Sequence, residues 1–167
     1  MNTIETIIKT LGLSPHPEGG YFKETYRSTG LIKTDSLNNA YNGSRNYGTC
    51  IYFLLTSGNF SALHRIKQDE IWHYYDGACI RLHVINEQGE YANHLIGKDI
   101  ANGERPQLVV PGGCWFGAEV VGEDSYSLVG CTVSPGFSFD DFEMKPREEL
   151  QKLYPHLKDL ISRLTRH

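Results

Sequence analysis

The sequence predicts an all-β fold, an antiparallel sandwich or barrel with short helices at both ends. Between residues 21 and 134, short segments rich in β-branched and aromatic residues alternate with turn signals such as TSGN, YDGA and PGG. Regularly spaced short strands separated by turns are typical of sandwiches and barrels. Nine strands are expected, over residues 21–28, 49–56, 61–66, 70–75, 79–86, 90–96, 107–110, 114–121 and 126–134.

Helices are expected only outside this β region. Over residues 1–12, apolar side chains recur at i, i+3, i+4 and i+7 on one helical face, and these are Ile4, Ile7, Ile8 and Leu11. Gly12 stands where a helix commonly ends. A second apolar stripe predicts C-terminal helices over residues 146–165, with Pro155 as the first residue of the later helix.

The other segments predict loops within a single domain. Residues 29–48 are polar and rich in turn residues, which favours a long surface loop of the kind used for binding or subunit contacts. The acidic run at residues 140–143 lacks the spacing of an EF-hand and is interpreted as a polar turn. With no internal repeat, we expect one domain over residues 1–167 and a barrel over residues 21–139.

Composition narrows the class of protein. The chain has 167 residues, 40% of them hydrophobic and 22% charged, which is typical of a globular domain. Its formal net charge is -4 and it has no basic run, so no nucleic-acid partner is expected. Apolar runs such as CIYFLL are too short to span a bilayer, and no secretion signal is recognised. The four cysteines form no CxxC pair, which favours reduced thiols and a cytoplasmic location.

The stretch GNFSALHRIKQDEIWHYYDG contains the candidate catalytic residues. Side chains alternate between the two faces of a strand, so His64 and Glu70 face the same interior if their strands pair as a hairpin. A buried imidazole and a buried carboxylate need each other or a ligand, because unpaired buried polar groups are costly. A single histidine such as His64 is more commonly a structural residue with a hydrogen-bonded ring. Because Glu70 occupies a strand position whose side chain can face the same interior, a functional pair is favoured instead.

Aromatic and polar side chains elsewhere are candidates for ligand binding. Aromatic walls with a few polar groups are what a small-molecule pocket needs, although the same rings also suit a barrel core. Arg27 near the end of the first strand suits a phosphate or carboxylate if it faces the pocket mouth, and is solvated otherwise. The candidate ligand-binding residues are Trp72, Tyr21, Arg27, Gln107, Trp115 and Phe116.

The spacing in this region resembles the first motif of the cupin superfamily. That motif is a glycine, five residues, HxH, three or four residues, a glutamate, six residues and a glycine. The chain matches it at Gly58, His64, Glu70 and Gly77, and has Ile66 in place of the second histidine. In the second cupin motif, the PxG element matches at Pro111, while the histidine and asparagine positions hold Phe116 and Val120.

The replacement of the second and third motif histidines by Ile66 and Phe116 leaves fewer metal ligands than the cupin motifs provide. A catalytic metal usually has three or four protein ligands, and only His64 and Glu70 stand at the family's ligand positions. His73 would replace a ligand only if a bulge turned it inward. The resemblance therefore implies either no cofactor or a weakly bound divalent metal.

More specifically, the chain resembles cupin family 5, a family of unknown function. The resembling segments are HPEGGYFKETYRS, TCIYFLLTSGNFSALHRIKQDEIWHYYDG, PQLVVPGGCWFGAE and SLVGCTVSPGFSFDDFE. The resemblance implies a double-stranded β-helix, that is, a jelly-roll barrel, usually dimeric and related in fold to the RmlC-type sugar epimerases. It supplies no established reaction, since fold does not imply function.

The epimerase resemblance suggests a mechanism. Those enzymes use a barrel histidine paired with an acidic residue to remove a proton next to a sugar carbonyl, and a tyrosine returns the proton. His64 would be the base, Glu70 its orienting partner, and Tyr74 the acid, with Tyr21, Tyr26 and Tyr52 as alternatives.

Three hypotheses remain open. The first is an isomerase or epimerase acting on a small polar ligand, carbohydrate-like or nucleotide-linked. The second is a non-catalytic cupin that binds a small molecule, and the third is a metal-dependent cupin enzyme with a reduced ligand set. In each case we expect a homodimer and no membrane partner.

Overall fold

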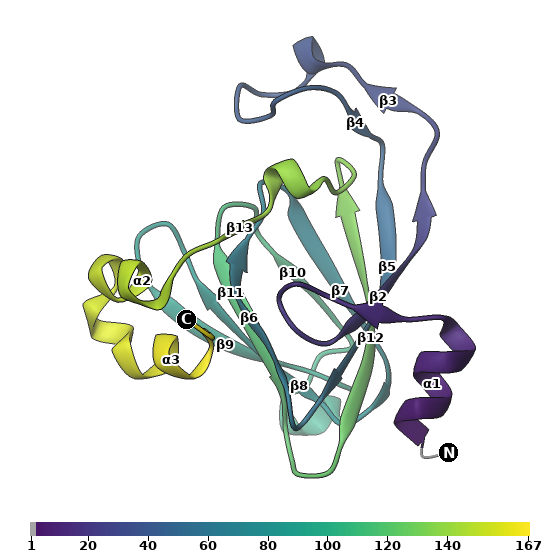
Figure 1. Cartoon of the computed structure of the whole chain (residues 1–167), viewed down its shortest axis with the longest axis vertical. Helices are drawn as coiled ribbons and strands as arrows, with labels where there is room; N and C mark the ends of the chain where they lie inside the picture. Colours follow the sequence, from purple (N-terminus) through teal and green to yellow (C-terminus); the bar gives the residue numbers. More distant parts are fainter. Residues whose placement is uncertain (1–2) are drawn as a thin grey trace.

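Two antiparallel sheets face each other in the computed structural model, which describes residues 3–167 (Figure 1). The first sheet consists, in order, of β1 (Ser14–Pro15), β2 (Tyr21–Arg27), β5 (Thr49–Thr56), β12 (Tyr126–Ser134), β7 (Asp69–Gly77) and β10 (Gln107–Val110). The second consists of β13 (Glu143–Met144), β6 (Phe60–Arg65), β11 (Trp115–Val120), β8 (Ile80–Ile85) and β9 (Tyr91–Ile96). This is the jelly-roll barrel that the sequence predicts, and all nine predicted strands are confirmed.

The hairpin considered for the strands of His64 and Glu70 does not form. β6 and β7 do not form a hairpin: β6 pairs with β11 and β13, whereas β7 pairs with β12 and β10. The short connection after Arg65 instead carries the chain from one sheet to the other. His64 and Glu70 still line the same interior, because they now face each other from opposite walls of the barrel.

The core divides into two apolar clusters. One fills the barrel interior and includes Phe53, Trp72 and Phe116. The other lies between the second sheet and the C-terminal helices, where Leu63 and Trp115 pack with members of the predicted apolar stripe, namely Leu150, Ile161 and Leu164. The helices α2 (Arg147–Leu153) and α3 (Lys158–Arg163) are joined by a 3-10 turn, Pro155–Leu157, so Pro155 does begin a new helical segment.

The N-terminal segment runs outside the barrel and then enters it. The helix α1 (Thr3–Leu11) ends next to Gly12, whose φ is +63°, and residues 1–2 of the predicted helix lie outside the described residues. The loop His16–Pro17–Glu18–Gly19–Gly20 follows, with positive φ at both glycines. A Cβ at Gly19 would collide with the Phe60 carbonyl, so these glycines let the loop lie closely against the barrel strands.

Residues 28–48 form an arm that extends beyond one end of the barrel (Figure 1). The arm contains β3 (Leu31–Ile32), β4 (Arg45–Asn46) and a 3-10 turn at Thr34–Ser36. The arm is largely exposed, as the sequence predicts for a surface loop, with one correction: the side chain of Arg45 is 5% exposed.

Two further 3-10 turns lie at Ile100–Asn102 and Phe139–Asp141. Within residues 3–167, no helix is long and apolar enough to cross a membrane.

Candidate active site in the barrel

A cavity of about 330 Å³ opens between the two sheets. Its walls are largely aromatic and are formed by Phe22, Phe53, Phe137, Phe139 and Phe142. A cluster of titratable side chains also lines it, and the members of this polar cluster are His16, Glu18, His64, Glu70 and Cys131. The cavity thus combines apolar walls with groups capable of proton transfer.

His64 on β6 is charged and fully engaged. Its Nδ1 lies 2.7 Å from the carbonyl oxygen of Ala62, and its Nε2 lies 2.9 Å from Oε2 of Glu18. Both partners are acceptors, so both ring nitrogens donate and the ring is an imidazolium. Burial opposes this charge, but the Glu18 carboxylate and the Ala62 carbonyl hold the pKa of His64 above its ordinary value.

Glu18 is the partner of His64, which corrects the expectation that Glu70 would be. Besides its contact with His64, Glu18 accepts a hydrogen bond at Oε1 from the Ser61 hydroxyl, at 2.9 Å. Burial disfavours the carboxylate, yet His64 and Ser61 together hold the pKa of Glu18 below its usual range. The HPEGG loop brings this carboxylate into the barrel, and the sequence offered only a turn signal there.

Glu70 on β7 is the titrating group of the polar cluster. Burial raises its pKa, the His64 charge opposes this effect and the Glu18 charge adds to it, and the combined result is a pKa of about 7. The Cys131 thiol and the Trp72 indole lie near this carboxyl and lower its pKa to a smaller extent. The indole N–H is fully buried and has no well-formed hydrogen bond to any described group. Glu70 therefore exists in both protonation states near neutral pH.

Arg27 lines the mouth of the cavity, which is the position that the sequence associates with binding of a phosphate or carboxylate. Its guanidinium binds both carboxylate oxygens of Glu24, at 2.9 and 2.7 Å, and donates to the Asn46 side chain and the Phe137 carbonyl. This half-exposed pair links β2 to the arm and to the segment around Phe137. Most of the hydrogen-bond donors of Arg27 are engaged within the protein, so this side chain stabilises the structure around the mouth of the cavity.

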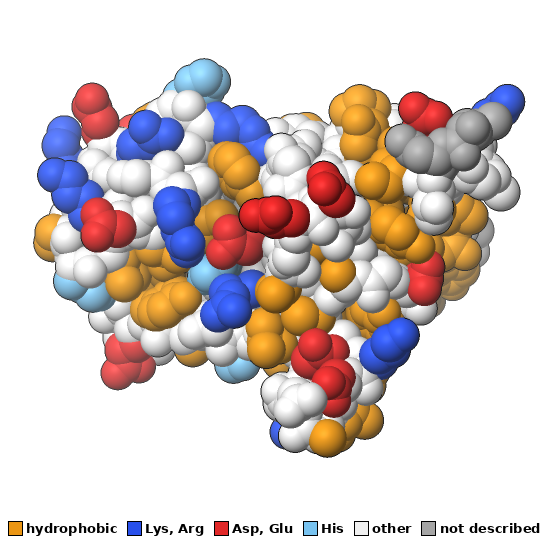
Figure 2. Space-filling model, turned by 90° about the horizontal axis from the view of Figure 1, so that it is seen from below, with side chains coloured by type: hydrophobic (Ala, Val, Ile, Leu, Met, Phe, Trp, Pro, Cys, Tyr) orange, Lys and Arg blue, Asp and Glu red, His pale blue; other side chains and the backbone are white. Residues whose placement is uncertain are grey.

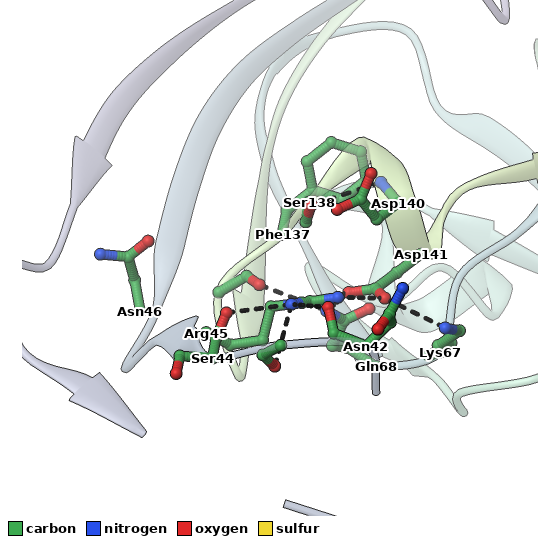
Figure 3. Close-up of polar contacts among 12 residues, drawn as sticks. Asn42, Ser44, Arg45, Asn46, Lys67, Gln68, Phe137, Ser138, Asp140 and Asp141 are labelled. Atoms are coloured by element: carbon green, nitrogen blue, oxygen red, sulfur yellow. Dashed lines mark hydrogen bonds and ion pairs between the residues drawn. The ribbon is translucent and has the colours of Figure 1, made fainter. Parts of the chain in front are cut away.

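A buried ion pair holds the arm against the aromatic wall of the cavity (Figure 3). Arg45 Nε and Nη2 each lie 2.7 Å from an oxygen of Asp141, while Nη1 donates to the carbonyls of three arm residues, Asn42, Gly43 and Ser44. Gln68 donates to Asp141 at 2.7 Å, and Lys67 Nζ lies 3.3 Å away. Burial opposes ionisation, but Arg45 and Gln68 hold the pKa of Asp141 below its usual range. The acidic run predicted as a polar turn thus contains a buried anchor.

Five of the six predicted ligand-binding residues do not line the cavity, and Arg27 is the one that does. Trp72 is fully buried in the barrel core, and Trp115 lies on the outer side of the second sheet, beneath the C-terminal helices and the Arg65 guanidinium. Tyr21 on β2 and Gln107 on β10 are not among the residues that line the cavity. Phe116 packs against His64, with the ring centroids 4.1 Å apart, and does not line the cavity either.

Tyr74, the predicted acid, does not face the cavity either. Its hydroxyl donates to the Gly77 carbonyl at 2.6 Å, close to the end of β7. This contact directs the phenol along its own strand and away from the polar cluster. The proton donor predicted from the epimerase resemblance is therefore not at the site.

The polar cluster does not fit a tightly held transition metal. Within the part of the chain that the structure describes, no three His, Cys, Asp or Glu side chains are arranged to hold a metal ion. Both nitrogens of His64 are engaged, Ile66 lines the cavity where the cupin motif has its second histidine, and Phe116 packs against His64 where the third would stand. His73, the possible replacement, bonds to Thr132 through Nε2.

Comparison with known proteins identifies the family. A family model described as cupin superfamily (DUF985), cupin family 5, matches residues 5–145. The chain belongs to cupin family 5. A curated protein of similar sequence is the uncharacterized protein YML079W of Saccharomyces cerevisiae, which is 30% identical over 161 residues, covering 91% of this chain and 80% of the yeast protein.

Solved structures of similar proteins share the whole fold of this cupin. A hypothetical protein from Leishmania major superposes with a TM-score of 0.91 at 39% identity, covering 99% of this chain and 100% of that one. Protein SO0799 from Shewanella oneidensis gives 0.87 at 40% identity, covering 99% of each chain. Oxalate decarboxylase from Bacillus subtilis gives 0.54 at 18% identity, covering 90% of this chain and 36% of that one, which shows a shared fold alone.

Proposed function

We propose that this cupin binds a small, uncharged polar ligand in the barrel cavity and moves a proton on it, in a reaction of the isomerase or epimerase type. The observation that carries the proposal is the buried Glu70 carboxyl, whose pKa of about 7 lies near neutral pH. A group with such a pKa is an efficient acid and base, because both of its protonation states are populated. Strongly perturbed carboxyl groups in a cavity are characteristic of functional sites.

The dimensions and walls of the cavity support a small ring-shaped ligand. Its volume of about 330 Å³ falls in the range of small-molecule sites. The rings of Phe22, Phe137 and Phe139 offer apolar faces, while the polar cluster offers hydrogen bonds at one side. A carbohydrate-like compound, with one apolar ring face and polar edges, has matching chemistry.

His64 serves this proposal as a fixed charge, not as a free base. Its ring nitrogens are committed to Ala62 and Glu18, so it has no lone pair for a substrate proton. The His64–Glu18 ion pair is neutral as a whole and leaves Glu70 as the group that changes charge. This assignment moves the acid–base role from the predicted histidine to the predicted carboxyl.

Hydrogen exchange tests the proposal. Unmodified protein in D2O should incorporate deuterium next to the carbonyl of a small keto-sugar, measured by NMR or mass spectrometry. Glu70→Gln should slow the exchange about 100-fold or more, the usual contribution of a positioned acid–base group. The matched control is Glu143→Gln, a half-exposed carboxylate that pairs with Arg65 on the far side of β6 and does not line the cavity. Equal rates in both variants would contradict the proposal.

A second candidate function is binding without turnover. It is favoured by the completeness of the His64–Glu18–Ser61 hydrogen bonds, which leaves only part of the polar cluster free for chemistry. Mass spectrometry of the denatured protein would then identify a copurified compound that the protein returns unchanged, with no exchange of its carbon-bound hydrogens.

We also propose that the chain forms a homodimer. The apolar face of α1 has no fully buried residue, and exposed rings such as Tyr26 and Tyr75 lie on strands of the first sheet. Hydrophobic side chains gather on the face next to the N-terminal end of the chain (Figure 2). Burying such a surface against a second copy would remove apolar area from water. Sedimentation equilibrium should give twice the mass of 18.9 kDa, and a monomer at micromolar concentration would contradict the proposal.

A further inference from the structure

His16 lies in the HPEGG loop, and its hydrogen bonding determines which ring nitrogen carries a proton. The backbone N–H of Glu18 donates to Nδ1 of His16 at 3.2 Å, so Nδ1 acts as an acceptor and carries no proton. Burial lowers the pKa of His16, even though the Glu18 carboxylate 3.6 Å away opposes this effect. His16 is therefore a neutral imidazole with its proton on Nε2.

This Nε2–H donor has no partner within the protein. Across residues 3–167, no hydrogen bond to His16 Nε2 is formed, although the side chain is only 8% exposed. Its ring is surrounded by phenylalanines, with centroids 4.5 Å away for Phe22 and about 6 Å away for Phe53, Phe139 and Phe142. Benzene rings offer no conventional acceptor. Nε2 is not among the fully enclosed polar atoms, so it is accessible from the cavity that His16 lines.

Three kinds of group thus surround one cavity. The His64–Glu18 ion pair is internally satisfied, Glu70 exchanges a proton near neutral pH, and His16 presents a fixed neutral donor. His16 adjoins the ion pair through Glu18, and Glu70 adjoins the same pair electrostatically from β7. A carboxyl group of tuned pKa together with a neutral imidazole donor is one of the combinations by which enzymes catalyse enolisation.

We propose that His16 donates its Nε2–H to the carbonyl oxygen of the ligand, and that the substrate class is an uncharged ketone or aldehyde with a hydrogen on the adjacent carbon. This inference rests on the proton-transfer function proposed above and specifies its substrate. The carbonyl oxygen of such a ligand would accept the hydrogen bond that the unpartnered Nε2–H of His16 can donate. An anionic group is disfavoured in the same place, because Glu70 adds negative charge there once it ionises.

The chemical step balances within these residues. The Glu70 carboxylate takes the proton from the carbon next to the carbonyl, the C–H bond breaks, and its electron pair forms the carbon–carbon double bond of an enolate. The negative charge on the enolate oxygen is stabilised by the His16 Nε2–H bond. Protonated Glu70 then returns a proton to the same face of the carbon, which exchanges that hydrogen with solvent hydrogen, and no oxidant or further reactant is needed.

The first experiment measures deuterium exchange into dihydroxyacetone by full-length protein and three variants. His16→Phe keeps an aromatic ring but has no donor, and should lower kcat about 100-fold or more, the usual effect of losing one donor to an oxyanion. His16→Gln, whose amide replaces both the acceptor and the donor, should recover part of this loss. Glu70→Gln is measured beside them. In both His16 variants, the pH profile should keep the ionisation of Glu70 near its unmodified position.

The outcomes separate the two proposals. If the unmodified protein catalyses no exchange, the proton-transfer function fails and this inference fails with it. If Glu70→Gln stops the exchange while His16→Phe retains the full rate, the inference alone is overturned and the function stands. A loss in His16→Phe that His16→Gln does not restore at all would also count against a hydrogen-bonding role.

A second experiment does not depend on activity. Nitrogen-15 NMR of histidine-labelled protein between pH 6 and 8 should show His16 with an unprotonated Nδ1 and a protonated Nε2. His64 should show both nitrogens protonated in the same spectrum. A proton on Nδ1 of His16, or a cationic His16 ring at neutral pH, would overturn the inference whatever the exchange rates.

Discussion

Replacing Arg45 by methionine tests how strongly the buried ion pair holds the arm to the barrel. The change removes the guanidinium but keeps most of the side-chain length, and it leaves Asp141 buried. Removing one partner of a buried ion pair typically costs about 3–5 kcal/mol. Gln68 and Lys67 remain beside Asp141, at 2.7 and 3.3 Å, so we expect the lower end of this range, about 3 kcal/mol.

Urea unfolding followed by fluorescence should measure this loss, and calorimetry should show a fall in Tm of about 6–12 °C for a domain of this size. The matched control is Arg27→Met, at the half-exposed pair with Glu24, which should cost no more than about 1 kcal/mol.

The double variant Arg45→Met/Asp141→Leu separates the charge effect from simple loss of contact. Because it leaves no unpaired buried charge, it should be more stable than Arg45→Met alone. The reasoning would be refuted if Arg45→Met unfolded within about 1 kcal/mol of the unmodified protein. It would also be refuted if the double variant were the less stable of the two.

The remaining predictions concern the polar cluster and the HPEGG loop. The raised pKa of Glu70 means that its stabilising contribution is present below pH 4.5 and is lost as the pH rises through about 7. The difference in unfolding free energy between the unmodified protein and Glu70→Gln should therefore fall by up to about 3 kcal/mol between pH 4 and 8, and a flat difference would contradict the pKa. His64→Ala leaves Glu18 buried without a counter-charge and should cost about 3 kcal/mol or more at neutral pH. This loss of stability should be largest at pH values between the lowered pKa of Glu18 and the raised pKa of His64, because the ion pair weakens as either group becomes neutral. Urea unfolding midpoints across this pH range measure it. A loss that grew in acid would contradict the assignment of His64 and Glu18 as an ion pair. Gly19→Ala, at a φ of +112° and against the Phe60 carbonyl, should destabilise the protein by about 1–3 kcal/mol. Gly58→Ala, where no atom lies within 4 Å of the added Cβ, should have little effect, and similar melting temperatures for the two would contradict the described loop.

The strands were predictable because their signal is local. Alternation of side chains and the turns between them require only neighbouring residues, so all nine strands appear where the pattern indicates. Which strands pair is a different question, since consecutive strands are often neighbours, and β6 and β7 are not. The side-chain parity of His64 and Glu70 nonetheless directs both toward the barrel interior, whichever sheet each strand joins.

Two of the five members of the polar cluster, His16 and Glu18, were not predictable by the same reasoning. His16 and Glu18 lie in a loop, where no periodicity tells which way a side chain points, and 46 residues separate Glu18 from His64 in the sequence. The ion pair of Arg45 with Asp141 joins positions 96 residues apart, in two segments that both read as polar surface. The segment HPEGGYF was a usable signal, because its two adjacent glycines permit a close approach to the barrel.

His16 and Glu18 lie in a loop outside the β strands. The strands that form the barrel and part of the chemistry inside it are therefore encoded by different segments of the sequence. A protein with this barrel but another N-terminal segment would keep its strands and lose two of the ionisable groups that set the charge balance around Glu70. Exchanging some five residues would then redirect the reactivity of the interior without redesigning a single strand. Relatives that agree along their sheets and differ in this short stretch should act on different compounds.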